Sequence, residues 1–221
     1  RIDIYKLFSQ EELQELDLET VRKKAEDALL FDAYREQEQL LAKYKNNTDI
    51  QGLENVLYMC PHCETEFAME VTGKSTLRCV HCGYSATGDE YGFLHHGGIG
   101  KPFRYVSDWS KHIYGVLKAK IKEDPGMTLS APTKLHMIDE KKDAFREVGE
   151  GALSLDREQF RITGTLHGEA SELCVPIGNL PTLPFSPGRH LEIQDGNKIY
   201  RCVLEDGRLA MKFINMVKIF F

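Results

Sequence analysis

The chain has 221 residues, 42% of them hydrophobic and 28% charged, and its formal net charge is −6 at pH 7. This composition is ordinary for a folded, water-soluble chain of one large domain or two to three small ones. No stretch is apolar for the roughly 18 residues that a membrane span requires, and no signal sequence opens the chain. Because it begins at Arg1 instead of methionine, we expect it to be a piece of a longer protein.

Residues 1–50 are predicted to form a helical segment. Ser9 followed by Glu12 fits a capping box, in which each side chain satisfies a backbone N–H at the helix start. A second helix is predicted over about 18–44, because apolar residues recur near one helical face. We interpret this stripe as a packing surface, and we expect 46–52 to be a linker. The stripe consists of Val21, Ala25, Leu29, Ala33, Leu40 and Leu41.

Four of the six cysteines stand in two close pairs with the spacing C-x2-C-x15-C-x2-C. They are Cys60, Cys63, Cys79 and Cys82. This spacing is typical of a structural zinc site and not of an extracellular disulfide framework, so we expect a reducing, cytoplasmic environment. Four thiolates leave no coordination position for water or substrate, and the predicted role of the ion is therefore to stabilise a small fold.

Zinc is the favoured metal, because nothing near the cysteines indicates an electron-transfer partner. Iron is the alternative, since the sequence Cys79–Tyr84 also resembles a rubredoxin knuckle. We interpret His62 and His81 as exposed turn residues, because imidazole ligands would compete with a full set of thiolates.

Residues 51–100 are predicted to be a zinc ribbon. Apolar and polar residues alternate on both sides of Thr72-Gly73-Lys74, as expected for two short strands joined by a tight turn. Gly83 follows the last cysteine, at a position that often needs a positive φ.

The ribbon segment holds six acidic side chains against two basic ones, a net charge of −4. A duplex-binding surface needs clustered Lys and Arg, so no nucleic-acid partner is expected. The charged residues are Glu54, Glu64, Glu66, Glu70, Asp89, Glu90, Lys74 and Arg78.

Residues 101–125 are predicted to be a linker loop and a helix that is capped by Ser107 or Asp108 and anchored by Trp109. The preceding Gly-rich stretch contains His95 and His96. We interpret this pair as part of a polar loop, because no Asp, Glu or Cys lies at ligand spacing.

From about residue 126 to 221 the period changes to two. Six alternating runs, at 128–139, 145–156, 159–166, 171–180, 189–196 and 198–206, are separated by turn signals. The apolar residues of 207–221 share a helical face. The predicted class is therefore α+β: N-terminal helices, a ribbon, and an antiparallel pleckstrin-homology-like sheet or barrel closed by a C-terminal helix. The shared helical face of 207–221 consists of Leu209, Phe213, Met216, Val217 and Phe220.

Four residues in this half raise questions of chemistry. Cys174 and Cys202 lie in apolar, strand-like surroundings, where a free cysteine usually behaves as a small buried hydrophobe. His190 and Asp195 match a His-x4-Asp acyltransferase motif. In a strand, however, the two would point to opposite faces about 16 Å apart, at about 3.3 Å per residue. We therefore interpret the match as chance and predict no catalytic residue.

Several motifs together carry a resemblance to a known family. They are "IYKLFSQEEL", "ALLFDAYREQEQ", "GLENVLYMCPHC", "RCVHCGYSATGDEYGFLH" and "VPIGNLPTLPFSPGRHLEI". In this combination the chain resembles the C-terminal region of bacterial lysophospholipid (1-acyl-glycerol-3-phosphate) acyltransferase-family proteins. The resemblance implies an N-terminal acyltransferase domain that carries the catalytic His-x4-Asp pair and precedes Arg1, so no catalytic residue of the family is carried over to this chain.

We therefore expect a non-catalytic accessory or regulatory tail of a phospholipid-synthesis enzyme, cytoplasmic and peripheral at the inner face of the membrane through its parent protein. Its expected partners are the acyltransferase domain of the same chain and a membrane surface. The cationic and apolar segment 212–221 suits such an interface, although a helix that plugs its own sheet is the favoured interpretation. The alternative function is a zinc-ribbon protein adaptor or, less favoured, a nucleic-acid-binding module.

Overall fold

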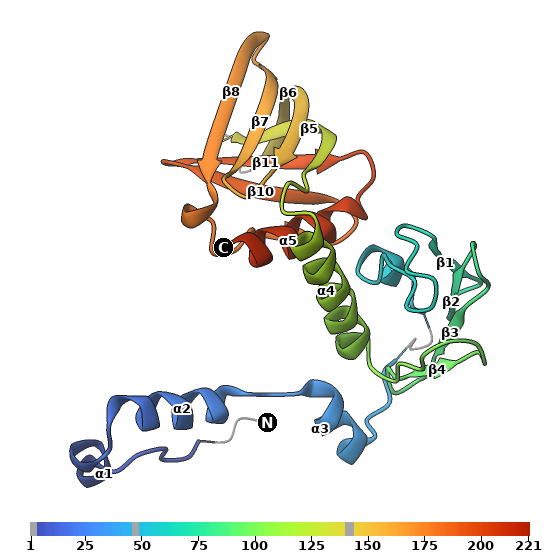
Figure 1. Ribbon diagram of the computed structural model, residues 1–221, viewed down its shortest axis with the longest axis vertical. Helices are drawn as coiled ribbons and strands as arrows, with labels where there is room; N and C mark the ends of the chain where they lie inside the picture. The colour runs from blue at the N-terminus through green and yellow to red at the C-terminus, as the bar shows by residue number, and fades with distance from the viewer. Residues whose placement is uncertain (1–3, 46–48, 140–143) are drawn as a thin grey trace. The chain divides into compact units, whose positions relative to one another are not determined.

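The computed structural model describes residues 4–45, 49–139 and 144–221, so part of the predicted linker, 46–48, lies outside the described residues. The chain divides into two compact units, Arg1–Lys43 and Tyr44–Phe221, which are described separately. Within the described residues the fold is mixed, with five α-helices and two antiparallel sheets (Figure 1). None of these helices combines the length and apolar character needed to cross a bilayer.

The first unit consists of helices α1 (Gln10–Glu15), α2 (Leu18–Leu29) and α3 (Ala33–Leu40). The predicted capping box is confirmed: the Glu12 N–H donates to Ser9 Oγ at 3.1 Å, and the Ser9 N–H donates to the Glu12 carboxylate at 2.7 Å. The prediction of one long helix over 18–44 is wrong. Asp32 starts a new helix by accepting hydrogen bonds from the Tyr34 and Arg35 N–H groups, and an N-cap residue has a non-helical backbone.

The expected packing stripe of this unit is also not buried. Leu29, Leu40 and Leu41 are 82%, 64% and 55% exposed. Among the described residues of the three helices, only Gln37 is buried. The reason is that helices of 6, 12 and 8 residues offer too little mutual surface to cover an apolar face.

In the second unit the ribbon forms a sheet of four antiparallel strands in sequence order: β1 (Met69–Thr72), β2 (Thr76–Cys79), β3 (Ser85–Gly88) and β4 (Leu94–His96). A short 3-10 helix, η1 (Leu53–Asn55), precedes it. The predicted β1–β2 hairpin is confirmed, with Thr72 opposite Thr76 and Gly73 at φ +64°. His95 and His96 lie in β4 and not in a loop, because β3 offers β4 an edge to pair with.

Helix α4 (Val106–Glu123) follows the ribbon. Its N-cap is Tyr105, without a side-chain hydrogen bond, so the predicted caps Ser107 and Asp108 both lie inside the helix. The helix begins earlier than predicted, directly after Tyr105, which is buried and packs its ring edge-on against Phe93. The predicted anchor Trp109 is fully buried.

The second sheet has seven antiparallel strands in the order β8-β7-β6-β5-β11-β10-β9. In Figure 1 strands β7 and β8 run across the direction of β10 and β11, and α5 (Leu209–Phe220) lies below the sheet. The strands are β5 (Leu129–Asp139), β6 (Ala144–Leu155), β7 (Gln159–Leu166), β8 (Glu169–Pro176), β9 (Phe185–Ser186), β10 (His190–Asp195) and β11 (Lys198–Leu204), with the 3-10 helix η2 (Ile177–Asn179) after β8.

A row of glycines lets β6 and β7 approach closely where the sheet changes direction. Cβ atoms at Gly149, Gly151 and Gly164 would lie 1.8 to 2.2 Å from backbone oxygens of the paired strand. A β-bulge lies in the same region, where Val148 of β6 is the extra residue opposite the Leu135–His136 step of β5. Bulges and glycines of this kind are the usual means of bending a sheet.

The sheet and α5 enclose one hydrophobic core. The predicted helical face is confirmed at Phe213, Met216 and Val217, which are fully buried in it. Cys202 is buried as expected, but Cys174 is exposed. In β8 side chains alternate between faces, and the inward position is taken by Val175.

The His-x4-Asp match lies on a strand, as predicted, because His190 and Asp195 are the first and last residues of β10. Asp195 pairs in register with Lys198 across the turn to β11. His190 instead approaches Glu192, with Nε2 to Oε1 at 3.6 Å. The carboxylate of Asp195 is therefore not the partner of this imidazole.

Substituting glycine in α4 should raise stability. Gly115 is an exposed residue in the middle of α4, and an added Cβ would meet no atom within 4 Å. Gly115→Ala should stabilise the folded state by about 1 kcal/mol, because alanine has the higher helix propensity. In the matched variant Gly151→Ala the Cβ would lie 2.1 Å from Thr163 O, so stability should fall. Urea unfolding gives the change in the free energy of unfolding for both variants. Equal changes would contradict the difference between an unobstructed helix position at Gly115 and a close strand contact at Gly151.

Candidate metal centre

The ribbon brings the sulfur atoms of Cys60, Cys63, Cys79 and Cys82 together, all within 4.8 Å of one another. The Sγ–Sγ distances are 3.6 Å between Cys60 and Cys82 and 3.7 Å between Cys63 and Cys79. A tetrahedron with metal–sulfur bonds of about 2.3 Å has edges of about 3.8 Å. A disulfide would need about 2.05 Å, so the arrangement fits one tetrahedral metal ion.

The two cysteine pairs repeat the same backbone structure. The Cys60 N–H donates to Thr65 O at 3.1 Å, and the Cys79 N–H donates to Tyr84 O at 2.7 Å. In each case the partner is five residues further along the chain. The repeat gives the two halves of the site matching geometry, although their sequences share only the cysteines and the histidine before the second cysteine of each pair.

Each turn is closed by a residue with a positive φ. Gly83, at φ +79°, donates its N–H to Cys79 O at 3.0 Å. Glu64 occupies the equivalent place in the first turn, at φ +54°, and donates to Cys60 O at 3.0 Å. The sequence indicated the positive φ at position 83 through its glycine. It gave no signal for Glu64, because the left-handed conformation is uncommon for glutamate.

The thiols differ in their readiness to lose a proton. Burial raises the pKa of Cys60 above its ordinary value, and burial also raises the pKa of Cys82. Burial opposes ionisation at Cys63 as well, but hydrogen bonds from the Thr65 hydroxyl and N–H and from His81 outweigh it and lower the pKa of Cys63 to about 5. Metal binding must therefore displace protons from the buried thiols, which makes affinity depend on pH.

The chemistry of this donor set is structural. Four thiolates complete a tetrahedral shell, so a bound ion has no position for water or substrate. Thiolate donors suit both zinc and iron. His62 and His81 are exposed, as predicted. His81 Nδ1 lies 3.4 Å from Thr65 Oγ1, where it supports the first cysteine pair from outside the sulfur cluster.

Buried aromatic side chains pack against the residues that flank the cysteines. Trp109 Nε1 donates to Met59 O at 3.0 Å, and its ring packs edge-on against Tyr84 at 5.4 Å between centroids. The Tyr84 hydroxyl donates to Lys101 O at 3.1 Å. The residues that flank the two cysteine pairs are thus held by a helix whose Trp109 lies 50 residues after Met59 in the sequence.

The residues that follow the first cysteine pair contact the start of α5. Lys212 Nζ lies 2.6 Å from the Glu66 carboxylate, and both side chains are at most 20% exposed. The Arg208 guanidinium donates to Phe67 O at 2.7 Å. Sequence reasoning missed this contact, because the residues are more than 140 positions apart and no local pattern relates them.

His95, interpreted from the sequence as part of a polar loop without an acidic residue at ligand spacing, does have a carboxylate partner. Its Nε2 lies 2.6 Å from Asp89 Oδ2, because the turn between β3 and β4 brings the two together. Burial raises the pKa of Asp89, but hydrogen bonds from His95 and from the Phe93 and Tyr91 N–H groups outweigh it and lower the pKa overall. Within the described residues only the four cysteines form a group able to hold a metal.

Comparison with known proteins adds little. No family model and no curated protein matches the chain. Among solved structures, a C-terminal domain of an unknown protein from Leishmania infantum is 13% identical, with a TM-score of 0.30 over 49% of this chain and 99% of that chain. The Dm DCP1 EVH1 domain in complex with the XRN1 DBM peptide is 14% identical, with a TM-score of 0.32 over 54% and 92%. Both TM-scores are below 0.5, so neither likeness defines this fold.

Removing the Thr65 hydroxyl should weaken metal binding most at acid pH. Thr65 Oγ1 lies 3.3 Å from Cys63 Sγ and helps lower the pKa of that thiol. In Thr65→Val the pKa of Cys63 should rise, so protons compete with the metal at pH 6 more than at pH 8. Competition with a chromophoric chelator should show zinc affinity reduced about tenfold at pH 6. Thr72→Val, at an exposed hairpin position, is the control. A loss of zinc affinity in Thr65→Val that is the same at pH 6 and pH 8 would contradict proton competition at Cys63 as the cause.

Removing the metal should increase hydrogen exchange in the ribbon and also in the first half of α4. Hydrogen exchange after chelation should accelerate in β1 to β4 and in the first half of α4, because Trp109 packs in the ribbon core. Exchange in β7 should stay slow, because that strand packs in the separate sheet core. Added zinc should restore protection. Unchanged protection around Trp109 would show that the ribbon core does not need the metal.

Proposed function

We propose that the chain is a non-catalytic accessory module in which a structural zinc site stabilises a ribbon fixed to an antiparallel sheet domain. The observation that carries this proposal is the position of the four sulfurs. They are close enough to complete a tetrahedral shell, and the residues behind them are shared with a helix of the sheet domain. A closed metal shell set in a hydrophobic core suits architecture and offers no reactive position.

For the sheet domain we propose a pleckstrin-homology-like fold, with the sheet curved toward a barrel and closed by α5. Support comes from the meandering antiparallel strands, from the glycine row that bends β6 and β7, and from the burial of the apolar face of α5. This form would present its outer strands and loops as binding surfaces on a rigid frame.

As the parent protein we propose an acyltransferase of phospholipid synthesis, which transfers an acyl group to lysophosphatidic acid or a related acceptor. The support is the resemblance of the motifs around the cysteine pairs and in the segment 175–193. On this proposal the module is cytoplasmic, its first partner is the acyltransferase domain of the same polypeptide, and its task is to position or regulate that domain near lipid.

Contact of the module itself with a membrane would need a surface other than the apolar face of α5. That face is buried against the sheet at Phe213, Met216 and Val217. Of the large apolar residues in the segment that suggested an interface, only the terminal Phe221 is largely exposed, and the cation Lys218 is also exposed. The favoured interpretation of this segment, a helix that plugs its own sheet, is therefore consistent with the structure.

A protein adaptor is the second candidate function, and one observation favours it. The first unit exposes large apolar side chains that include Leu18, Leu30 and Phe31, at 75% to 84% exposure. Monomeric proteins rarely leave so much apolar surface uncovered. The acidic ribbon continues to argue against nucleic acid.

The coding sequence upstream of the Arg1 codon tests the proposal directly. It should encode an acyltransferase domain with a His-x4-Asp motif. Acyl transfer by that whole polypeptide should then fall when residues 1–221 are deleted and stay absent from the isolated module, because the module positions the catalytic domain without reacting. A different upstream domain would overturn the acyltransferase proposal and favour the adaptor, and acyl transfer by the isolated module would contradict its non-catalytic role.

A further inference from the structure

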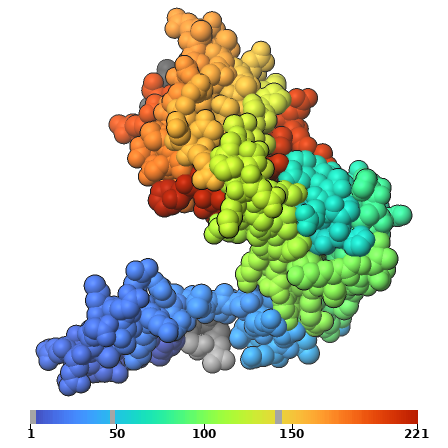
Figure 2. Space-filling view, viewed as in Figure 1, coloured from blue at the N-terminus to red at the C-terminus, as the bar shows by residue number. Residues whose placement is uncertain are grey.

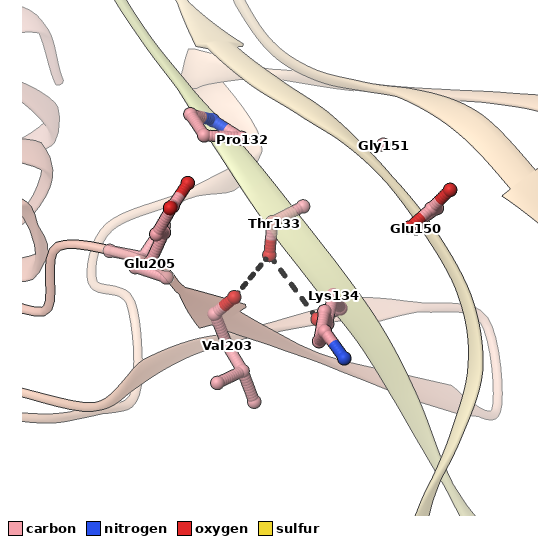
Figure 3. A pocket seen from close by; sticks show the side chains of 8 residues that line it. Pro132, Thr133, Lys134, Glu150, Gly151, Val203 and Glu205 are labelled. Carbon is pink, nitrogen blue, oxygen red and sulfur yellow. Dashed lines mark hydrogen bonds between the residues drawn. The ribbon is translucent and has the colours of Figure 1, made fainter.

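A groove of about 590 Å³ opens where strands β5 and β11 separate (Figure 3). β11 pairs with β5 only as far as the Leu204–Thr133 pair. β5 continues beyond this point and pairs with β6 as far as Leu129 opposite Leu155. The groove therefore lies in the wedge between the diverging strands, and its volume falls in the range of ligand sites.

The backbone itself keeps the groove open. At its centre Thr133 is 95% buried, and its hydroxyl donates to Val203 O at 3.0 Å, which ties the two strands together where they part (Figure 3). Gly151 lies opposite Thr133 on β6. A Cβ there would lie 2.1 Å from Thr163 O, so position 151 cannot carry a side chain that would fill the groove.

The rim of the groove is acidic. Lys134 Nζ is paired with the Glu147 carboxylate at 3.1 Å, so the one cation of the lining is already offset. Glu150 and Glu205 line opposite sides, are exposed, and have no ion-pair partner among the described residues. The apolar walls come from Pro132, Val203 and Leu204.

We propose that this groove docks a peptide segment of a partner protein in which one lysine or arginine is flanked by apolar residues. The apolar walls would bury the flanking side chains, and Glu150 and Glu205 would attract the cation at the rim. The same carboxylates would repel anionic headgroups and nucleic-acid phosphates. The site lies outside the metal centre and depends on neither the metal nor the acyltransferase parent, so its failure leaves the proposed function untouched.

A short fluorescein-labelled peptide with one lysine between valine and leucine pairs is the probe, and anisotropy with the whole chain is the measurement. Binding should be detectable below about 1 mM and should weaken with added salt. Replacing the peptide lysine by glutamate should reduce affinity about tenfold, and replacing its apolar residues by serine should also reduce it. No binding of the lysine peptide at about 1 mM overturns the proposal.

Charge substitutions inside and outside the groove test whether the peptide binds there. Glu150→Gln/Glu205→Gln should weaken the lysine peptide several-fold, and Glu150→Lys/Glu205→Lys should reverse the preference toward the glutamate peptide. Glu158→Lys/Glu169→Lys changes the net charge equally at exposed positions outside the groove and should leave the preference unchanged. Thermal unfolding of each variant checks the fold. Binding that responds equally to both charge reversals would be nonspecific attraction and would overturn the groove as the site.

Discussion

The second unit depends on one helix that belongs to two hydrophobic cores. Trp109 and Ile113 of α4 are buried in the ribbon core, and Leu117 and Ile121 are buried in the sheet core. In an α-helix residues four positions apart advance by about 40°, so the buried face turns by about 120° between Trp109 and Ile121. This turn lets a straight helix face the ribbon at one end and the sheet at the other. In the space-filling view the ribbon and α4 form a continuous surface (Figure 2).

The metal site follows from the small size of the ribbon. Its strands have three or four residues, and so small a sheet buries too little apolar surface to be stable alone. A tetrathiolate site adds metal-binding free energy that is realised only in the folded state. Trp109 completes the arrangement by fixing the chain beside Cys60 through Met59 O. Metal and helix therefore stabilise the same few residues.

Fixing the ribbon to the sheet domain has a consequence for function. Glu66 and Phe67, which follow the first cysteine pair, contact Lys212 and Arg208 at the start of α5. A partly buried ion pair contributes orientation more dependably than net stability. Four thiolates would leave a bound ion no open coordination position, and the groove where β5 and β11 separate is a surface of the same unit.

The sequence by itself determined the features that depend on local pattern: the grouping of the four cysteines from their spacing, the Ser9 cap, the β1–β2 hairpin, most strands of the second sheet, and the buried face of α5. Tertiary structure alone decided the rest. Nothing local shows that Lys212 meets Glu66, or that Cys174 faces outward while Cys202 is buried. Spacing and periodicity describe a segment and its neighbours, whereas burial and pairing depend on which distant surface covers that segment, and only the folded chain brings such surfaces together.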